Sequence, residues 1–388
     1  MFIWYMLRHY YIILVISFFT LAAYSQERGY EVIGGMPAFY KQLRASLTYP
    51  LAWSAAPDTD FCTWRSRVRE KLLECMSPAP PHADGYDMEI VSEQQRQGYK
   101  AQKIMFNLSA WSRVPAYLLV PDSQGKHPAV LLLHDHGAHF SIGKEKMVRP
   151  FDVPDETLAD ADKWSEKYFE GQYVGDYLAA NGYVVLAVDA ILWGDRGRKE
   201  GDSYDAQQVL SANLLQMGMS LGGLIAWDDV RSAEFLASLP CVDKDRVGVM
   251  GFSMGAHRAW MTAAATDAVS TAASVCWMCT TDSLMTEANN QSKGGSAYTM
   301  IIPGIRRYLD YPHVASIACP KPMLFIAGSL DKLFPVAGVN EAYEVMRQVW
   351  ESQSASDKFE TCIYDVPHSC GKRIQEHVLL FFDKQLKQ

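Results

Sequence analysis

The chain has 388 residues, with 36 lysines and arginines against 44 aspartates and glutamates, which gives a formal net charge of −8. Hydrophobic residues make up 49% and charged residues 21%, a composition that is typical of globular proteins and excludes an intrinsically disordered chain. The acidic balance argues against a nucleic-acid-binding protein, which would need a basic face. Eight cysteines in this length are too few for a disulfide-built scaffold.

The N-terminus is predicted to be a cleaved signal peptide. Residues 1–25 contain Arg8 and no acid, and residues 10–21 form an apolar run. Small residues at Ala23 and Ser25 suit a peptidase that cuts after Ser25. The alternative is a membrane anchor, but the run is shorter than the roughly 20 residues that span a bilayer. We expect an exported protein, periplasmic or secreted, without a stable membrane anchor after cleavage.

Residues 26–85 are expected to form an N-terminal helical extension. Its apolar side chains recur at helical spacing, at Phe61, Trp64, Val68, Leu72 and Leu73. The proline-rich segment 77–81 breaks this pattern and is typical of a linker. We therefore expect three parts: the signal peptide (1–25), the extension (26–85) and a catalytic domain (86–388).

From residue 86 onward, short strand-like runs alternate with helical patterns. The first three runs resemble antiparallel strands, and the later ones are continuously apolar, as in strands buried on both faces. This alternation predicts an α/β fold with a mostly parallel, twisted sheet and helices on both faces. The expected strands are 86–91, 99–107, 114–120, 129–134, 182–188, 246–252, 271–278, 323–327 and 359–364, and the expected helices are 205–239, 255–266, 340–351 and 371–388. Long insertions at 139–165 and 280–312 follow strand ends, where binding sites usually form.

A nucleophile motif lies between a predicted strand and a predicted helix. The pattern G-x-S-x-G matches residues 251–255, Gly-Phe-Ser-Met-Gly. Glycines are needed because larger side chains two residues before and after Ser253 would collide in so tight a turn. The serine hydroxyl then projects near the N-terminus of the following helix, whose positive end favours a developing oxyanion. A plain glycine-rich turn is the alternative interpretation.

A serine nucleophile needs a base, and the base needs an orienting acid. Asp331 and His368 each come directly after a predicted strand, in the chain order Ser, Asp, His of the nucleophile-elbow architecture. Parallel strands bring their carboxyl ends to one edge of a sheet, so Ser253, Asp331 and His368 are expected to meet there. The competing acid is Asp282, which follows the strand 271–278.

An oxyanion hole requires two backbone N–H groups. We assign one to Met254, the residue after the nucleophile, and the other to Ala138, in the glycine-containing loop 134–138. The same loop carries a rival interpretation, because His134, His136 and His139 could bind a metal. No other ligand group pairs with this loop, so we predict neither a metal nor a cofactor.

Four residues near the strand ends are candidates for substrate binding. Arg196 could bind a carboxylate, with a structural ion pair as the alternative. Trp193 and Trp277 could stack on sugar rings, with core packing as the alternative, and His136 lies on the oxyanion loop. Cys276-x-x-Cys279 has redox or metal spacing, but its apolar surroundings favour buried core cysteines.

The quoted motifs resemble those of the α/β hydrolase superfamily, and more closely the dienelactone hydrolase and acetyl xylan esterase-like branch of secreted bacterial esterases. The resemblance covers roughly 58–388. It rests on the helix 61–76 and on residues 132–137, 226–229, 242–247, 251–255 and 320–323, ahead of Asp331. It implies an α/β-hydrolase fold and metal-free ester hydrolysis by Ser253, Asp331 and His368. Dienelactone hydrolases proper use a cysteine nucleophile, whereas this chain has a serine.

The resemblance also suggests the substrate, because members of this branch often remove acetyl or methyl ester groups from plant polysaccharides. We therefore expect a serine esterase that acts on a small ester or an esterified oligosaccharide. A serine peptidase of the same fold and a non-catalytic carbohydrate-binding protein are the alternatives. These residues leave the acyl group, the sugar and the oligomeric state open.

Overall fold

The computed structural model describes residues 31–33, 36–286 and 297–387. The predicted signal peptide, 1–25, lies outside these residues. The described residues divide into two compact units, one made of those within 31–48 together with Thr286 and the other made of 49–285 with 297–387. In the first unit, β1 (Val32–Ile33) pairs antiparallel with β2 (Met36–Pro37), and α2 (Tyr40–Ala45) follows.

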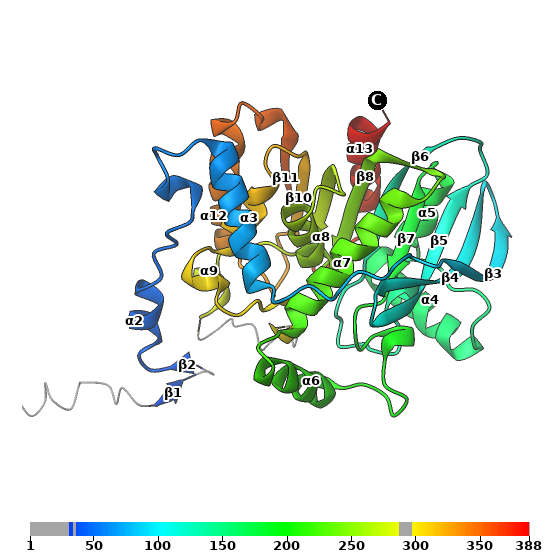
Figure 1. The fold of residues 1–388 in the computed structure, drawn as a ribbon, viewed down its shortest axis with the longest axis horizontal. Helices are drawn as coiled ribbons and strands as arrows, with labels where there is room; N and C mark the ends of the chain where they lie inside the picture. Colours follow the sequence, from blue (N-terminus) through cyan, green and yellow to red (C-terminus); the bar gives the residue numbers. More distant parts are fainter. Residues whose placement is uncertain (1–30, 34–35, 287–296, 388) are drawn as a thin grey trace, which may run out of the picture. The chain divides into compact units, whose positions relative to one another are not determined.

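The second unit is built on a nine-stranded sheet in the order β11-β10-β9-β8-β6-β7-β5-β4-β3 (Figure 1). Six neighbouring strands are parallel, and β5, β4 and β3 extend the sheet by antiparallel pairing. The strands are β3 (Glu89–Arg96), β4 (Tyr99–Ser109), β5 (Ser112–Pro121), β6 (His127–Leu133), β7 (Val184–Val188), β8 (Val242–Phe252), β9 (Thr271–Val275), β10 (Met323–Gly328) and β11 (Phe359–Tyr364). The predicted mostly parallel α/β sheet is confirmed.

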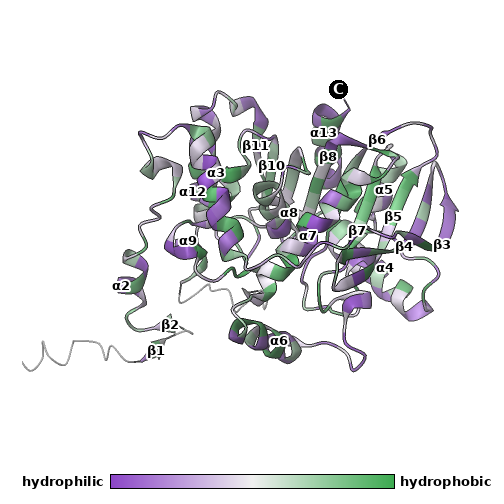
Figure 2. Cartoon of the chain, in the orientation of Figure 1, coloured by the Kyte–Doolittle hydropathy of each residue, from purple (hydrophilic) through white to green (hydrophobic). Residues whose placement is uncertain are grey.

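Helices cover both faces of this sheet, and each face has its own hydrophobic core. Side chains alternate along a strand, so Leu131 packs into one core while its neighbour Leu132 packs into the other. In Figure 2 the central strands β5 and β7 are coloured mostly hydrophobic, whereas the helices alternate between hydrophilic and hydrophobic residues. The first core contains residues of α3 (Phe61–Cys75), α7 (Leu221–Ser238), α8 (Met254–Ala265) and α12 (Val336–Ser352), and the second contains residues of α4 (Asp155–Phe169), α5 (Val174–Ala180) and α13 (Lys372–Leu386).

The expected extension 26–85 does not coincide with a compact unit. Trp64, Val68 and Leu72 of α3 are buried in the first core together with residues of the sheet. The division into compact units falls after Thr48, and the boundary at residue 85 stays a prediction. The first part of the expected extension also holds the short strands β1 and β2, so it is not wholly helical.

The predicted helix 205–239 is two helices. α6 (Tyr204–Gln216) ends before Gly218, whose φ of +73° lies in the left-handed region that glycine tolerates best. The Ser220 side chain then caps α7 by accepting a hydrogen bond from the N–H of Gly223. Within the described residues no single helix is long and apolar enough to cross a membrane, and α6 with α7 meets that test only as a pair bent by 90°.

The two predicted insertions carry short helices. The first holds the 3-10 helix η2 (Lys144–Lys146) and runs into α4. The described part of the second holds α9 (Thr281–Leu284), α10 (Ala297–Met300), η5 (Ile305–Arg307) and the start of α11 (Tyr311–Ala315). Both insertions follow the carboxyl ends of parallel strands, β6 and β9, at the edge of the sheet where Ser253 lies.

Candidate active site

Ser253 occupies a sharp turn between β8 and α8. Its φ of 57° and ψ of −123° are strained for a residue with a side chain. The turn is held because the Ser253 N–H donates to the carbonyl oxygen of Val275 in β9 at 2.9 Å. This is the conformation that places a serine hydroxyl beyond the end of a strand.

Two glycines make this turn sterically feasible. A Cβ atom on Gly251 would lie 2.0 Å from the carbonyl oxygen of Gly255, and a Cβ atom on Gly255 would lie 1.8 Å from the carbonyl oxygen of Leu133. Both distances are far inside van der Waals contact, and both partners are backbone atoms. The glycines of the motif therefore permit close packing of α8 against the ends of β8 and β6.

The structure brings His368 and Asp331 to this serine. The Oγ of Ser253 lies 2.8 Å from Nε2 of His368, and Nδ1 of His368 lies 2.6 Å from Oδ2 of Asp331. The Asp331 side chain is almost fully buried, and its other carboxylate oxygen accepts the N–H of Leu333 at 2.9 Å. In this arrangement Nδ1–H donates to Asp331 and leaves Nε2 to accept the serine proton. Asp282 is exposed in α9, and the hydrogen bond from His368 goes to Asp331.

The two predicted oxyanion donors differ in whether their backbone N–H groups already have a hydrogen-bond partner. Met254 is the first residue of α8, where backbone N–H groups have no partner within the helix. The N–H of Ala138 instead donates to Nδ1 of His136 at 3.0 Å. Ala138 has a φ of 54° and follows Gly137, whose φ is 58°. The role of Ala138 in an oxyanion hole stays a prediction, and it requires the N–H to be shared with or released from His136.

The three histidines of this loop face three different partners. Nδ1 of His134 bonds the carbonyl oxygen of Asp135 at 2.8 Å while Nε2 accepts the N–H of Ala190 at 2.9 Å. His136 is bonded at both ring nitrogens, and Nε2 of His139 contacts Asp160 at 2.7 Å. Because these nitrogens do not converge, the described residues give no support to a three-histidine metal site.

Burial holds two of these imidazoles neutral. Desolvation lowers the pKa of His134 well below its usual value, and it lowers the pKa of His136 to about 3. Nδ1 of His136 accepts from Ala138, so a neutral ring must carry its proton on Nε2. Nε2 of the Gln207 side chain in α6 lies 3.0 Å from that nitrogen. Turning this amide by 180° presents its oxygen as the acceptor of the proton, since two N–H groups cannot bond each other.

A buried lysine that sequence analysis did not single out fastens the same loop. Nζ of Lys146, with no solvent exposure, donates to the carbonyl oxygens of Asp135 and His136, each at 3.1 Å. Its ammonium also lies 4.7 Å from the ring centre of Trp164. Burial lowers the pKa of Lys146, and the nearby Asp135 carboxylate partly opposes this effect. The Lys-Glu-Lys tripeptide has the composition of a solvated turn, so only its place after β6 could have drawn attention to it.

A second buried lysine organises the next loop. Lys144 places its ammonium within 2.6 to 2.8 Å of carboxylate oxygens of Glu145, Asp189 and Asp195. Burial alone would lower the pKa of Lys144, but Asp189 and Glu145 outweigh it and raise that pKa well above its usual value. The three carboxylates lie close enough together to suit a metal ion, and the ammonium occupies their centre.

Three of the four predicted substrate contacts are buried. Trp193 has no exposed surface, and its Nε1 donates to the carbonyl oxygen of His136 at 3.2 Å. Trp277 is buried in an aromatic cluster that reaches His368 through Phe334. Arg196 is paired with Asp228 at 2.8 Å, as in its alternative interpretation as a structural ion pair. His136 is likewise buried, so the structure does not expose Trp193, Trp277 or His136 for contact with a substrate.

The cysteines of the C-x-x-C pattern also face different partners. Sγ of Cys276 contacts the carbonyl oxygen of Ser369 at 3.6 Å, and Sγ of Cys279 contacts that of Pro335 at 3.9 Å. Both side chains are buried and reduced. Burial raises the pKa of each thiol to about 12, which makes both poor nucleophiles and poor metal ligands.

Comparison with known proteins agrees with this fold. A family model, Abhydrolase_7, described as an abhydrolase family, matches residues 22–362, and the chain belongs to this family. A curated relative, YtaP of Bacillus subtilis strain 168, bears the name of a hydrolase. It is 25% identical over 323 residues, which cover 83% of this chain and 100% of YtaP.

Solved structures show the same fold. A Bacteroides fragilis protein described as an acetyl xylan esterase is 20% identical with a TM-score of 0.66, and 85% of this chain aligns with 81% of it. A glucuronoyl esterase from Solibacter usitatus is 15% identical with a TM-score of 0.61, and 87% of this chain aligns with 97% of it. These findings confirm the predicted α/β-hydrolase fold and the resemblance to acetyl xylan esterase-like proteins.

Proposed function

We propose that the protein is a serine esterase that hydrolyses carboxylic esters by acyl transfer. The observation that carries this proposal is the continuous hydrogen-bonded line from Ser253 through His368 to Asp331, with distances of 2.8 and 2.6 Å. Each side chain in this line has the chemistry of one role: a nucleophile, a base and an orienting acid.

In the first half of the reaction, the Oγ of Ser253 attacks the ester carbonyl carbon while Nε2 of His368 takes the serine proton. The carbonyl oxygen becomes an oxyanion, which the N–H of Met254 and a second donor from the 134–138 loop stabilise. Asp331 stabilises the imidazolium and fixes its orientation. The bond to the alcohol oxygen then breaks, and His368 gives its proton to the leaving alcohol.

In the second half, water replaces the alcohol. His368 accepts a proton from the water, which attacks the acyl carbon bound to Ser253. The acyl–Oγ bond breaks, the proton returns to Ser253, and the free acid leaves. The side chains that take part in these reaction steps are in contact in the structure. The mechanism requires His368 to be neutral at the start of each half of the reaction.

The proposed natural substrates are acetyl or methyl esters on a carbohydrate. Support comes from the names of structurally similar proteins, which include an acetyl xylan esterase and a glucuronoyl esterase, both acting on esters. The fold alone does not select a substrate. The substrate therefore has to be identified from the chemistry of the site and by assay.

The deciding experiment uses the chain from Gln26 onward. It is incubated with acetylated and with methyl-esterified polysaccharides, and released acetate and methanol are measured separately, with Ser253→Ala as the control. Release by the wild type and not by the variant supports the proposal. Cleavage of peptides in preference to esters would favour a peptidase, and inertness toward every ester would favour a non-catalytic carbohydrate-binding protein.

A further inference from the structure

A tryptophan stands exposed at the tip of the hairpin that joins β4 to β5. Trp111 has 74% of its surface exposed, the largest fraction among the exposed large hydrophobic side chains of the described residues. Its backbone N–H donates to Oγ of Ser109 at 3.2 Å, so the turn itself is ordered by a local hydrogen bond. Leaving so large an aromatic ring in water forgoes the favourable energy of its burial.

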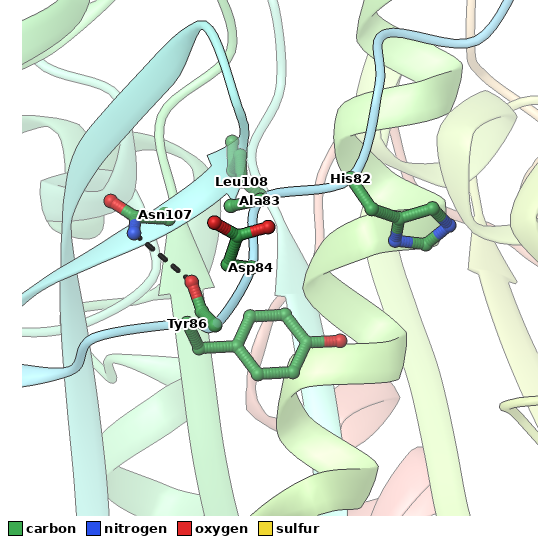
Figure 3. A pocket seen from close by; sticks show the side chains of 7 residues that line it. His82, Ala83, Asp84, Tyr86, Asn107 and Leu108 are labelled. Carbon is green, nitrogen blue, oxygen red and sulfur yellow. Dashed lines mark hydrogen bonds between the residues drawn. The ribbon is translucent and has the colours of Figure 1, made fainter.

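A pocket is lined by the segment 82–86 and by the last part of β4 (Figure 3). The N–H of Ala110 donates to the carbonyl oxygen of Pro81 at 2.9 Å, which ties the tryptophan-bearing turn to the segment that forms the pocket. The volume of about 280 Å³ lies just below the usual range for ligand sites, roughly 300–1,000 Å³. We call it the edge pocket, and its lining residues are His82, Ala83, Asp84, Gly85, Tyr86, Asn107 and Leu108.

Hydrogen bonds hold the residues that line the edge pocket in place. The N–H of Asn107 donates to the carbonyl oxygen of Tyr86 at 2.8 Å, and its side-chain amide donates to that of Gly85 at 3.0 Å. Arg231 of α7 is buried and donates both to Nε2 of His82 and to Glu234. Because Nε2 of His82 accepts, a neutral ring carries its proton on Nδ1.

The edge pocket also offers hydrogen-bonding groups to a ligand. Within the described part of the chain, no hydrogen bond or ion pair engages the exposed carboxylate of Asp84. This carboxylate can accept hydrogen bonds from hydroxyl groups, while Nδ1–H of His82 can donate one. Acceptors and donors beside the ring of Tyr86 suit a sugar, which presents hydroxyl groups at its rim and C–H groups on its faces. The exposed ring of Trp111 lies outside this lining, on the turn that the Ala110–Pro81 hydrogen bond ties to the pocket segment.

Strand register places the edge pocket on the same edge of the sheet as Ser253. Through β6, β7 and β5, Gly251 of β8 is level with Ile104 of β4. Ser253 lies two residues beyond that level, and Asn107 lies three residues beyond it in the same direction. Four strand steps separate β8 from β4, which corresponds to roughly 19 Å across the sheet.

We propose that Trp111 and the edge pocket form a distal subsite that binds a sugar unit of the carbohydrate chain whose ester reacts at Ser253. The separation from the serine means that only a substrate of several sugar units reaches both places. The inference rests on the proposed esterase function and adds the prediction that the enzyme prefers long substrates. It assigns no catalytic role to Trp111.

The test compares two substrates in the wild type and in Trp111→Ala. One is a small soluble aryl acetate without a sugar, and the other is whichever esterified polysaccharide the wild type hydrolyses, cut into fragments of graded length. We expect the ratio of kcat/KM for long fragments to kcat/KM for the aryl ester to fall about 3-fold to 10-fold in the variant, mainly through KM. The shortest fragments are expected to show no such loss.

Controls separate this inference from the proposed function and from misfolding. Leu380→Ala replaces another exposed hydrophobic residue, 61% exposed on α13, and is expected to leave the ratio unchanged. An equal loss of activity on both substrates in Trp111→Ala, or an unchanged ratio at every length, overturns the distal subsite. Hydrolysis of small esters but of no polysaccharide overturns it too, whereas a wild type inert toward every ester refutes the esterase function itself.

Discussion

Lys146 donates its ammonium proton to the carbonyl oxygen of His136 at 3.1 Å from a position without solvent exposure. That carbonyl belongs to the peptide that leads into Gly137 and Ala138, the loop assigned to the oxyanion hole. A buried ammonium fixed on the backbone therefore holds in place the loop that we predict to stabilise the developing charge on the substrate. We predict that Lys146 is a positioning residue, because it would act through the loop.

Replacing Lys146 with methionine should lower kcat for a small ester about 10-fold to 100-fold with little change in KM, because a displaced oxyanion donor weakens only the transition state. The matched control is Lys321→Met. Lys321 is partly buried and donates to the carbonyl oxygens of Ala263 and Thr266, at the far end of α8. Both variants should lose thermal stability, but a comparable loss of kcat in Lys321→Met would reduce Lys146 to a general structural role.

Ser253→Ala should lower kcat by about 10⁵ to 10⁶ with the fold intact, because members of such a triad act as a unit. A serine-directed phosphonate should label Ser253 in the wild type and no residue in the variant. Mass spectrometry identifies the labelled peptide, and thermal unfolding checks the fold. More than a few per cent of wild-type activity in the purified variant would move the chemistry away from this serine.

Local sequence accounts for most of the fold. All nine strands of the large sheet were predicted, because each is a short β-type or continuously apolar run bounded by turn residues. The helix 205–239 was predicted as one element, whereas the structure ends α6 at Gln216 and begins α7 at Leu221. Gly218 ended α6 through a left-handed conformation that composition alone does not impose.

Long-range contacts account for what sequence analysis missed. The proline-rich segment 77–81 resembled a linker, yet Nε1 of Trp227 bonds the carbonyl oxygen of Ser77 at 3.0 Å and holds the segment on α7. Chain order predicted that Ser253, Asp331 and His368 would meet, because parallel strands share an edge. No local pattern signals the bond between Ala138 and His136, since it depends on the backbone angles of the folded loop.

The two candidate acids can be separated by substitution. Asp331→Asn should lower kcat by about 10⁴, because an amide would favour the wrong tautomer of His368. Asp282→Asn should have little effect, since Asp282 is exposed in α9 and the hydrogen bond from His368 goes to Asp331. Steady-state measurements of kcat for both variants on one small ester show which of the two carboxylates is the triad acid. A crippled Asp282→Asn beside a nearly normal Asp331→Asn would show that the acid has been assigned wrongly.

Thiol labelling should distinguish core cysteines from reactive ones. At pH 8 iodoacetamide should modify Cys62, which is exposed, much faster than Cys276, Cys279 or Cys370. Burial raises the pKa of all three buried thiols, to about 12 for Cys276 and Cys279. Denaturation should make all eight cysteines reactive, as counted by mass spectrometry. Rapid labelling of Cys276 in the folded protein, with loss of activity, would instead indicate an accessible thiol beside His368.

The pH dependence of activity should report a single proton. His368 must be neutral to accept the serine proton, so kcat/KM should fall about tenfold per pH unit on the acid side. His136 and His257 should not contribute there, because burial lowers the pKa of each to about 3. Prolonged EDTA treatment should leave the profile unchanged, whereas a site built on the loop histidines would lose activity and regain it with Zn²⁺. A slope of two, or sensitivity to the chelator, would contradict the proposed mechanism.

The lowered pKa values of His136 and His257 allow us to predict how the free energy of unfolding changes with pH. In the unfolded chain they take up protons below about pH 6.5, whereas in the folded protein burial keeps them neutral down to about pH 3. The unfolded state therefore binds more protons in this window, and the free energy of unfolding should decrease steadily as the pH falls from about 6.5 to 3. His257→Phe is the informative variant, since α8 buries this ring among aromatic side chains. Its melting temperature should depend less steeply on pH than that of the wild type, and an equally steep dependence would place the acid sensitivity in other groups.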